Sequence, residues 1–446
     1  MESEIEHINS DFFDKKLFQK QLDIIAHSSE LAQERTNYFS AHNDNIIRAI
    51  DIVEEFLRKK HRLCYGGQAI NAHLPAKYKF YDPEYSIPDY DFFTPQQSAD
   101  INTLVADFKK AGFTEISVRE GMHEGTIKIY VDYVPVADMT SINNKLYKIL
   151  SHREFRLDGI SYLDANSLRM LMYLELSRPR GEVGRWTKVY ERLSLFNEFV
   201  PVKSCKIRRN AFKYYLSMEQ TQCILDFIIE NKRIFSGADL LGFYEHALKH
   251  RKKDTSLILT SKKPILFFSP DAATDAKKLK TELNFIYQSN ISVTIKSVTP
   301  RSGDLVPSMK IISQNNKPII FIIGQEACSS YFNLSVRDDK LLRIASMDTL
   351  ITLYFSLGLF DSSLFDMGSM ECLANQLIQI SIKARNSSNS FIFPFISIKC
   401  AGHQTSLPSL IRSKVKRITQ KKQKLKSLLS KSNTRNTVKS TNVLHT

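Results

Sequence analysis

Apolar residues recur at helical spacing through the first sixty positions of the chain. In residues 45–62 they return every three or four positions, the pattern of an amphipathic helix with one buried face. Residues 2–40 show the same periodicity, and the apolar positions there are Phe12, Phe13, Leu17, Leu22 and Ile25. We therefore predict a packed N-terminal helical region over residues 1–44, followed by a helix that leads into the first sheet.

After residue 62 the pattern changes to short strands. Residues 63–65 form an apolar strand, a Gly-Gly pair turns the chain, and residues 68–74 have helical spacing. Ser98 is placed to cap a further helix, whose apolar stripe is Ile101, Leu104, Val105 and Phe108. Alternating apolar and polar residues then predict strands at 116–119, 126–133 and 134–139. Together these elements predict a mixed sheet with helices.

The pattern divides the rest of the chain. Residues 164–249 have helical spacing, and the basic run at 249–253 is typical of a linker. Beyond it we expect strands at 264–268, 292–298 and 319–323 and helices at 271–288 and 347–357. The fold class is therefore α/β (α+β). The predicted segments are the N-terminal region, a mixed-sheet domain at 45–150, a helical region at 151–253, a C-terminal α/β domain at 254–400 and a partly disordered basic tail at 401–446.

Two acidic residues, Asp89 and Asp91, stand in an apolar stretch. On a strand, a spacing of two puts both carboxylates on one face, where they repel each other. A cation between them relieves the repulsion, and carboxylate oxygens suit Mg²⁺, which also binds substrate phosphates. The pair alone leaves open the alternative of two solvated acids at a strand end.

Upstream of this pair, Gly66 and Gly67 lie between a strand and a helix. Glycine takes up positive φ and lets the backbone approach a ligand, and the free N–H groups of a helix start bind anions such as phosphate. Without other features, such a pair is most often only a tight turn. Its combination with the acidic pair favours a site for a phosphate and a metal.

A third acid is expected on a later strand. Asp138 lies among Val136, Ala137 and Met139, a costly place for a carboxylate unless it is paired or binds a metal. The competing candidate is Asp132, which strand alternation puts on the polar face. We therefore prefer Asp138 as the third acid and interpret Asp132 as solvated.

Composition restricts the partners. The 446-residue chain has a net charge of +15 and a pI near 9.3, which favours a polyanionic partner, nucleic acid or an anionic membrane. No apolar run is long enough to span a bilayer, and the acidic start lacks a signal-peptide core, so we expect nucleic acid and no membrane partner. Six scattered cysteines without zinc spacing indicate reduced thiols in a cytoplasmic protein.

Positive charge is concentrated in two stretches. The helix predicted after residue 181 separates an apolar stripe from a basic one formed by Arg185, Lys188 and Arg192, which is either a solvated face or a phosphate-binding face. Near the C-terminus we expect a basic helix that fades into a disordered tail after Ser427 and contacts RNA. The candidate RNA-binding residues in it are Arg412, Lys414, Lys416, Arg417, Lys421 and Lys422.

These motifs together resemble a known superfamily. A Gly-Gly turn into a helix, an Asp-x-Asp strand and a third Asp are similar to the DNA polymerase β-like nucleotidyltransferases. Five segments resemble the corresponding sequences of the poly(A) polymerase catalytic subunits of large cytoplasmic DNA viruses. They are residues 65–71, 87–93, 123–128, 136–140 and 174–188. The resemblance is specific over residues 63–201. The chain departs from many superfamily members by having Gly-Gly rather than Gly-Ser and a long insert at 72–86.

The resemblance implies a template-independent polymerase that adds AMP from ATP to RNA 3′ ends and releases pyrophosphate. It implies that Asp89, Asp91 and Asp138 are catalytic and bind two Mg²⁺ ions, with Mn²⁺ as a substitute. Gly66, Gly67, Lys188 and Arg185 would bind the nucleotide. It further implies a homodimer or a processivity subunit as partner, the host cytoplasm during infection or the virion as location, and a second α/β domain that is a degenerate copy of the first.

Other function classes remain open. One is another enzyme, either a nucleotidyltransferase of different nucleotide specificity or a glycosyltransferase that uses Asp-x-Asp to hold Mn²⁺ and a sugar nucleotide. The Gly-Gly helix start and the third acid argue against the glycosyltransferase. The other class is a non-catalytic RNA-binding or processivity subunit on the same fold, and three intact acids argue against it. Trials of UDP-sugars beside the four nucleoside triphosphates separate these functions.

Overall fold

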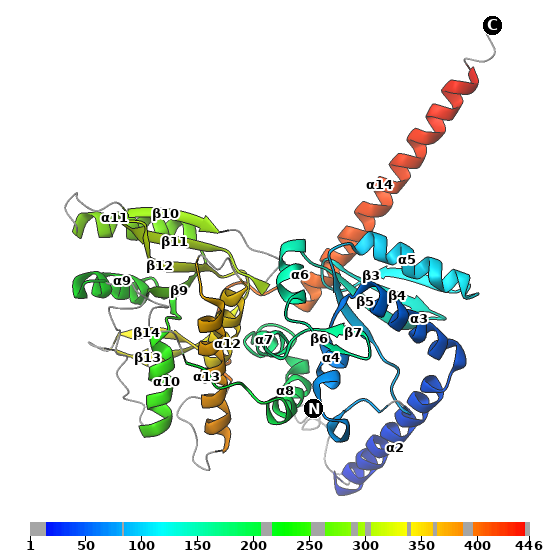
Figure 1. Cartoon of the computed structure of the whole chain (residues 1–446), viewed down its shortest axis with the longest axis horizontal. Helices are drawn as coiled ribbons and strands as arrows, with labels where there is room; N and C mark the ends of the chain where they lie inside the picture. Colours follow the sequence, from blue (N-terminus) through cyan, green and yellow to red (C-terminus); the bar gives the residue numbers. More distant parts are fainter. Residues whose placement is uncertain are drawn as a thin grey trace.

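The computed structural model describes residues 15–82, 84–206, 216–250, 264–286, 293–298, 305–336, 340–359, 364–386 and 396–441. Two α/β halves, each built on one sheet, lie side by side with helices between them (Figure 1). This confirms the predicted fold class. In the described part of the chain, no helix is both long and apolar enough to cross a membrane.

The first sheet has seven strands in the order β3-β4-β5-β2-β1-β7-β6. Its strands are β1 (Leu63–Tyr65), β2 (Tyr90–Thr94), β3 (Ile116–Glu120), β4 (Thr126–Val131), β5 (Val134–Ser141), β6 (Phe155–Leu157) and β7 (Ile160–Tyr162). The β1–β2 pair is antiparallel, whereas β2–β5 and β1–β7 are parallel. The predicted mixed sheet is therefore confirmed, and parallel pairing of β2 with β5 brings together residues almost fifty positions apart.

The helices of this half are α3 (Asp44–Lys60), α4 (Gly66–His73), α5 (Gln97–Lys110), α6 (Asn144–Ser151), α7 (Ala165–Leu176) and α8 (Trp186–Phe199), with short 3₁₀ turns at Ala76–Tyr78 and Val183–Arg185. Helix α3 buries its predicted apolar stripe, except for Ile47, and is capped by the Asn43 side chain. The prediction that Ser98 caps α5 is wrong. The cap position is Gln96, whose N–H donates to the Thr94 hydroxyl, so the helix begins before Ser98.

Helix α2 (Lys15–Ala41) has no buried residue. Leu17 and Ile25 are 53% and 65% exposed, so the prediction that these apolar positions form a packed region is wrong. Phe12 and Phe13 lie outside the described residues. Periodicity reveals an apolar face, but it carries no information on whether another element covers that face.

The second sheet has eight strands in the order β10-β11-β12-β9-β8-β14-β13-β15. They are β8 (Ile234–Phe235), β9 (Ile265–Ser269), β10 (Val293–Val298), β11 (Met309–Gln314), β12 (Lys317–Gly324), β13 (Ser329–Ser335), β14 (Leu341–Ala345) and β15 (Cys400–Ala401). Strand β8 thus joins this sheet from within the predicted helical middle region.

The helices of the second half are α9 (Met218–Glu230), α10 (Asp239–His250), α11 (Ala272–Ile286), α12 (Met347–Gly358), α13 (Met367–Asn386) and α14 (Leu407–Thr441). Because α10 extends to His250, the first two positions of the predicted linker are helical, and residues 251–253 lie outside the described chain. Helix α14 continues beyond Ser427, where we expected order to fade. Its sequence after that point contains no Pro or Gly to end a helix.

The second half repeats the first. Read across the sheet, the seven strands β10-β11-β12-β9-β8-β14-β13 correspond one for one to the seven strands of the first sheet. Strand β15 is an addition at the edge. A buried ion pair marks the same place in each half: Arg62 with Asp100 at 2.7 Å, and Arg233 with Asp275 at 2.6 Å. In each pair the Asp also accepts a hydrogen bond from a strand-end hydroxyl.

The two sheets can be aligned through their pairing registers. Leu63 pairs with Phe93 in the first, and Ile234 pairs with Phe268 in the second. By the same count, Pro264, Leu266 and Phe321 take the places of Asp89, Asp91 and Asp138. Apolar side chains stand where the carboxylates would be, so the second half is a copy of the fold without its acids.

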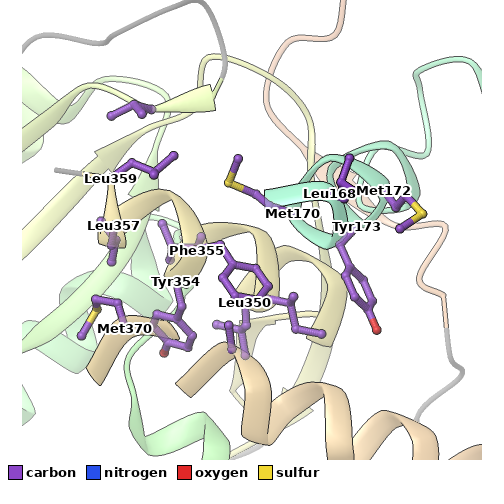
Figure 2. Close-up of a cluster of buried hydrophobic side chains, with 14 of the residues drawn as sticks. Leu168, Met170, Met172, Tyr173, Leu350, Tyr354, Phe355, Leu357, Leu359 and Met370 are labelled. Atoms are coloured by element: carbon purple, nitrogen blue, oxygen red, sulfur yellow. The ribbon is translucent and has the colours of Figure 1, made fainter. Parts of the chain in front are cut away.

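Equivalent helices of the two halves pack against each other. Figure 2 shows Leu168, Met170, Met172 and Tyr173 of α7 beside the apolar side chains of α12, which include Leu350, Tyr354 and Phe355. The Ser356 hydroxyl also contacts the Met170 sulfur at 3.8 Å. This Leu- and Met-rich face of α7 is therefore core, and it lies at the junction between the halves.

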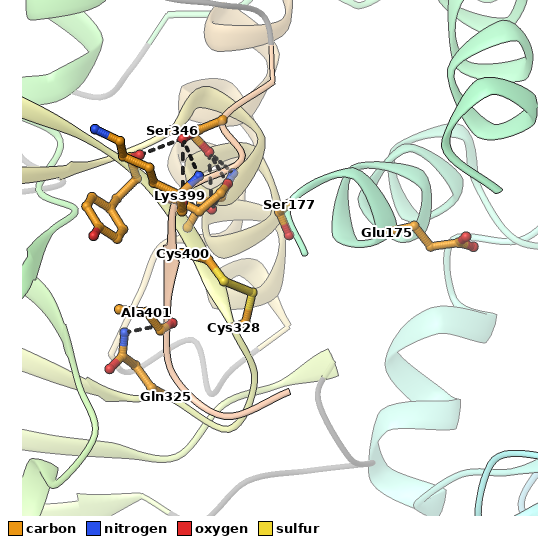
Figure 3. Close-up of a disulfide and its surroundings, with 12 residues drawn as sticks. Glu175, Ser177, Gln325, Cys328, Ser346, Lys399, Cys400 and Ala401 are labelled. Carbon is orange, nitrogen blue, oxygen red and sulfur yellow. Dashed lines mark hydrogen bonds between the residues drawn. A yellow bond between two sulfur atoms is a disulfide. The ribbon is translucent and has the colours of Figure 1, made fainter. Parts of the chain in front are cut away.

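The expectation that all cysteines are reduced is wrong for four of them. Cys205 is bonded to Cys372, and Cys328 to Cys400, across sequence separations of 167 and 72 residues. Their Cα atoms are 5.7 and 5.6 Å apart, which suits a disulfide. Figure 3 shows the disulfide bond between Cys328 and Cys400, which lies on β15. Scattered spacing hid these pairs, because only the fold brings such distant positions together.

Candidate active site

Four side chains form one row across the first sheet. Tyr65 pairs with Asp91, Asp91 with Asp138, and Asp138 with Lys128, so that β1, β2, β5 and β4 contribute one residue each. Residues in one such row point to the same face of a sheet. Asp89 precedes Asp91 by two positions and shares this face. The predicted acids therefore lie together, although they are up to 49 positions apart in sequence.

The glycine turn lies directly against the acids. Gly66 has a φ of 74°, and a methyl group there would lie 2.3 Å from Asp91 Oδ2. A methyl group on Gly67 would lie 2.3 Å from the Tyr81 hydroxyl oxygen and 3.0 Å from Arg192 Nη1. Both positions therefore require glycine, the first for its backbone conformation and both for the close approach of a polar side chain. The start of α4 borders the carboxylates.

The acids are crowded with like charge. Desolvation, followed by repulsion from Asp89 and Asp138, raises the pKa of Asp91 to about 7. Desolvation and repulsion from Asp138 raise the pKa of Asp89 to about 6. The Asp89 side chain remains exposed to solvent, so we attribute more of its pKa shift to repulsion than to burial. Negative charge at this site needs a positive partner.

Asp138 is buried at 7% exposure, and Lys128 from the neighbouring strand binds its Oδ2. The hydrogen bond and the charge of Asp138 outweigh desolvation and raise the pKa of Lys128. The other oxygen, Asp138 Oδ1, is buried without a hydrogen-bond partner. A buried carboxylate oxygen without a partner is costly, and it is the kind of atom that a cation or a ligand satisfies.

The donor set suits a divalent cation. It consists of carboxylate oxygens from Asp89, Asp91 and Asp138, the hard ligands that Mg²⁺ prefers. The unpartnered Oδ1 and the like-charge crowding that raises the pKa values of the first two acids fit a site for a divalent cation. In the arrangement that the described residues adopt, no three acidic, His or Cys side chains form a group ready to hold a metal ion. Lys128 neutralises Asp138 instead.

A positively charged face of α8 borders the row. The pKa of Lys188 is lowered by the charge of Arg192, by desolvation and by the charge of Arg185. Arg185 contacts Glu175 at 3.5 Å and Glu182 at 3.6 Å and still acts on Asp91 through its charge. Like charges held together in this way create a local excess of positive potential, which an anion relieves.

Two residues that the sequence did not single out complete the site. Lys128 belongs to the polar face of an alternating strand, and only strand register puts it next to Asp138. Tyr81 comes from the insert at 72–86, and its hydroxyl accepts a hydrogen bond from Arg192 at 2.9 Å. The insert therefore folds over Gly67 and forms part of the rim. No local pattern in the sequence indicates either contact.

A cavity of about 590 Å³ flanks the site without containing the acids. It lies between α3, α4 and the insert, with Gln68, Asn71, Tyr81, Ile87 and Pro88 among its lining residues. Gln68 directly follows the glycine pair, and Pro88 directly precedes Asp89. Tyr81 is thus a wall of this cavity while its hydroxyl lies against Gly67.

The other predicted residues lie farther away. Asp132 is in the turn between β4 and β5 and has a φ of 49°. It precedes Asp138, the β5 residue in the row of acids, by six positions. In α14, Arg417 and Lys421 both contact Glu120 at the end of β3. Arg412, Lys416 and Lys422 are exposed, and Lys414 is half-buried.

Comparison with known proteins finds related sequences that cover the region of this site. Residues 51–182 match the family model described as "Poly(A) polymerase catalytic subunit". A putative poly(A) polymerase catalytic subunit of Acanthamoeba polyphaga mimivirus is 26% identical over 220 residues, 46% of this chain and 37% of that protein. The protein of the same description from African swine fever virus isolate Pig/Kenya/KEN-50/1950 is 24% identical over 316 residues, 68% of this chain and 59% of that protein.

The fold has a solved counterpart. The crystal structure of the Megavirus polyadenylate synthase superposes with a TM-score of 0.70 at 17% identity, over 94% of this chain and 85% of that one. The matches to the two curated relatives span only 37% and 59% of their lengths. The family match contains all three acids and both glycines of the site. The resemblance seen in the sequence is thereby confirmed.

Proposed function

We propose that this chain, whose residues 51–182 match the poly(A) polymerase catalytic subunit family, is a polynucleotide adenylyltransferase. It extends RNA 3′ ends without a template. In each cycle the 3′-hydroxyl oxygen attacks the α-phosphorus of ATP. A new phosphodiester O–P bond forms, the bond between the α-phosphorus and the bridging oxygen breaks, pyrophosphate leaves, and the hydroxyl proton is released.

One observation carries this proposal most strongly. Asp91 and Asp138 are register partners on parallel strands, and the backbone of Gly66 lies within van der Waals contact of the Asp91 carboxylate. A phosphate seated on the start of α4 would therefore lie against carboxylates that suit a divalent cation. Positioning and electrostatic stabilisation are what phosphoryl transfer requires from a protein.

Each residue then has a distinct task. Asp89, Asp91 and Asp138 hold divalent cations, and Asp138 orients the RNA 3′ end toward the nucleotide. Bound Mg²⁺ supplies activation of the hydroxyl and neutralisation of the triphosphate. The N–H groups that follow Gly66 and Gly67 bind phosphate oxygens. Lys188 of α8 and Arg185 of the turn before it approach the same triphosphate, because Arg185 acts through its charge both on Lys188 and on Asp91.

Lys128 has a different task in this scheme. It balances Asp138 when no cation is present, so the buried carboxylate is not left with an unpaired charge. The second carboxylate oxygen of Asp138, Oδ1, stays available to a cation or a ligand. Nothing in the reaction forms a covalent bond to the protein, so no nucleophilic Ser or Cys is required.

The test uses the full chain, an unstructured oligo-RNA, Mg²⁺ and each nucleoside triphosphate in turn, with products separated on a gel. We expect a ladder with ATP. Asp91→Ala and Asp138→Ala should abolish it while RNA binding persists, and Asp132→Ala should leave it intact. An inactive Asp132→Ala beside an active Asp138→Ala would show that the third acid is misassigned.

The same experiment separates the alternative functions. A ladder with another nucleotide would make the chain a nucleotidyltransferase of different specificity. RNA binding without extension by any nucleotide would indicate a non-catalytic subunit. Consumption of a UDP-sugar in place of any nucleotide addition would indicate a glycosyltransferase, the function that the glycine turn against Asp91 disfavours.

A further inference from the structure

Helix α14 carries more positive charge than its one acidic partner in the described chain, Glu120, compensates. Between residues 407 and 427 the helix has eight Lys or Arg and no Asp or Glu. Several lie four positions apart, as Arg412 and Lys416 do, and like charges at this spacing destabilise a helix. A helix of this composition gains little from its own sequence, so external contacts must stabilise it.

The first such contact fixes the N-terminal end of the helix. Strand β15 pairs with β13, and a disulfide joins Cys400 of β15 to Cys328, the residue directly before β13. Figure 3 shows Cys400 next to Ala401, whose carbonyl accepts a hydrogen bond from Gln325. Gly402 then turns the chain with a φ of 107°. The helix begins at Leu407, five residues after this anchored turn.

The second contact fixes its middle. Arg417 Nε lies 3.6 Å from Glu120 Oε2, and Lys421 binds Glu120 Oε1. Arg417 also donates to the Met122 carbonyl at 3.4 Å. One helix face is therefore fastened to the edge strand β3, and the helix extends from there beyond the body of the protein (Figure 1). Two of the residues that we predicted to bind RNA are occupied in this way.

The fastening point lies beside the row of acids. Arg119 is the β3 partner of Lys128, which pairs with Asp138, so Arg119 belongs to the same row. Three strand spacings separate β3 from β2, which is about 15 Å. Glu120 follows Arg119 and points to the opposite face of the edge strand. An RNA backbone that leaves the acids and crosses the edge at exposed Arg119 meets α14 next.

The cations that face away from Glu120 remain for a ligand. At 100° of rotation per residue, Arg412, Lys416 and Lys426 lie roughly 140–180° around the helix from Lys421, and Lys422 lies about 100° from it. All four are exposed. They span about 21 Å along the axis at 1.5 Å per residue. In the described chain, no acidic side chain pairs with these four. A flexible polyanion satisfies such a line of charges.

We propose that α14 is a fixed arm that binds the RNA backbone upstream of the 3′ end, with Arg417 and Lys421 as its fastening and the outward cations as its binding face. The identity of the polyanion as RNA rests on the proposed function. The arm holds the product near the site between additions, so it acts on product length rather than on the chemical step.

Two variants separate the charge of the arm from its attachment. The outward variant combines Arg412→Gln, Lys416→Gln and Lys422→Gln. Its matched control removes the same charge from a different helix, α11, through Lys277→Gln, Lys278→Gln and Lys280→Gln. The attachment variant is Glu120→Gln, which keeps every positive charge of the arm and removes only its anchor.

RNA binding is measured by fluorescence anisotropy across a salt series, and product length on a gel. The outward variant should lower the log–log salt slope by about 2, since each phosphate contact to a single strand contributes roughly 0.7. It should also shorten the products and raise KM for the primer in addition of the first nucleotide. The control should match the unsubstituted chain. Glu120→Gln should keep the salt slope and shorten the products.

Three results would overturn the inference. The first is an outward variant with the full salt slope and product length. The second is full-length product from Glu120→Gln, which would make the attachment irrelevant. The third is loss of binding to anionic lipid vesicles, rather than to RNA, in the outward variant. If the unsubstituted chain adds no nucleotide, the proposed function fails, and the salt slopes still decide whether the arm binds RNA.

Discussion

Substitution of Gly66 by alanine tests whether the glycine turn and Asp91 form one site. The position has a φ of 74°, where a residue with a Cβ costs about 1–2 kcal/mol in folding free energy. The new methyl group would lie 2.3 Å from Asp91 Oδ2, whereas ordinary contact begins at 3.4 Å. The carboxylate must therefore move by about 1 Å, and a misplacement of that size costs on the order of 100-fold in rate.

Gly112→Ala is the matched control. Gly112 has a φ of 92°, so alanine there carries a similar backbone cost, but nothing lies within 4 Å of its new methyl group. Both variants should therefore show a similar fall in melting temperature. Only Gly66→Ala should lose nucleotide addition, and it should still bind RNA.

The assay is single-nucleotide addition to a labelled RNA primer at saturating Mg²⁺, reported as kcat/KM, beside thermal unfolding of each variant. We expect Gly66→Ala to fall at least about 100-fold below Gly112→Ala. Equal activity of the two variants would refute the reasoning, because it would mean that the position of the Asp91 carboxylate does not matter for the reaction.

Three further predictions concern regions around this site. Lys188→Ala should raise KM for ATP or for the primer without lowering the melting temperature, because the side chain is exposed. Lys203→Ala is the control. Unchanged kinetics of Lys188→Ala would indicate that this face of α8 is only solvated. Cys372→Ser should lower stability by about 2–5 kcal/mol in unreduced protein, and peptide mapping that finds free thiols there would contradict the disulfide. The two α14 cations lower the pKa of Glu120, so its contribution to holding the arm is complete above the ordinary value of 4.5 and is lost as pH falls through the lower folded value. Fluorescence energy transfer between a label on α14 and a label on the turn at 121–125 should therefore differ between the native chain and Glu120→Gln above pH 4.5. The transfer efficiencies of the two proteins should become equal as the pH falls through the lower folded value.

Local patterns in the sequence determined much of the site. The two-residue spacing of Asp89 and Asp91 placed both on one face, since side chains alternate along a strand. The apolar neighbours of Asp138 distinguished it from Asp132, which the structure puts in a hairpin turn away from the row. The catalytic roles of these acids stay predictions until the substitutions are made.

Only the tertiary structure decided which distant residues meet. Strand register brought Lys128 to Asp138, the insert brought Tyr81 over Gly67, and the fold paired four cysteines that looked isolated. The family resemblance led us to expect a degenerate copy of the first half, but the residues of the second half did not show it, because that copy keeps the strand order and loses the acids.

The amphipathic patterns of α2 and α14 show the same limit. Both sequences have helical spacing, yet α2 buries no residue, and α14 is held through one carboxylate, Glu120, almost 300 positions away. Periodicity reports the conformation of a segment and the face it offers, because these depend on near neighbours. The partner of that face depends on contacts between segments far apart in the chain, and these are fixed only when the sheets set their register.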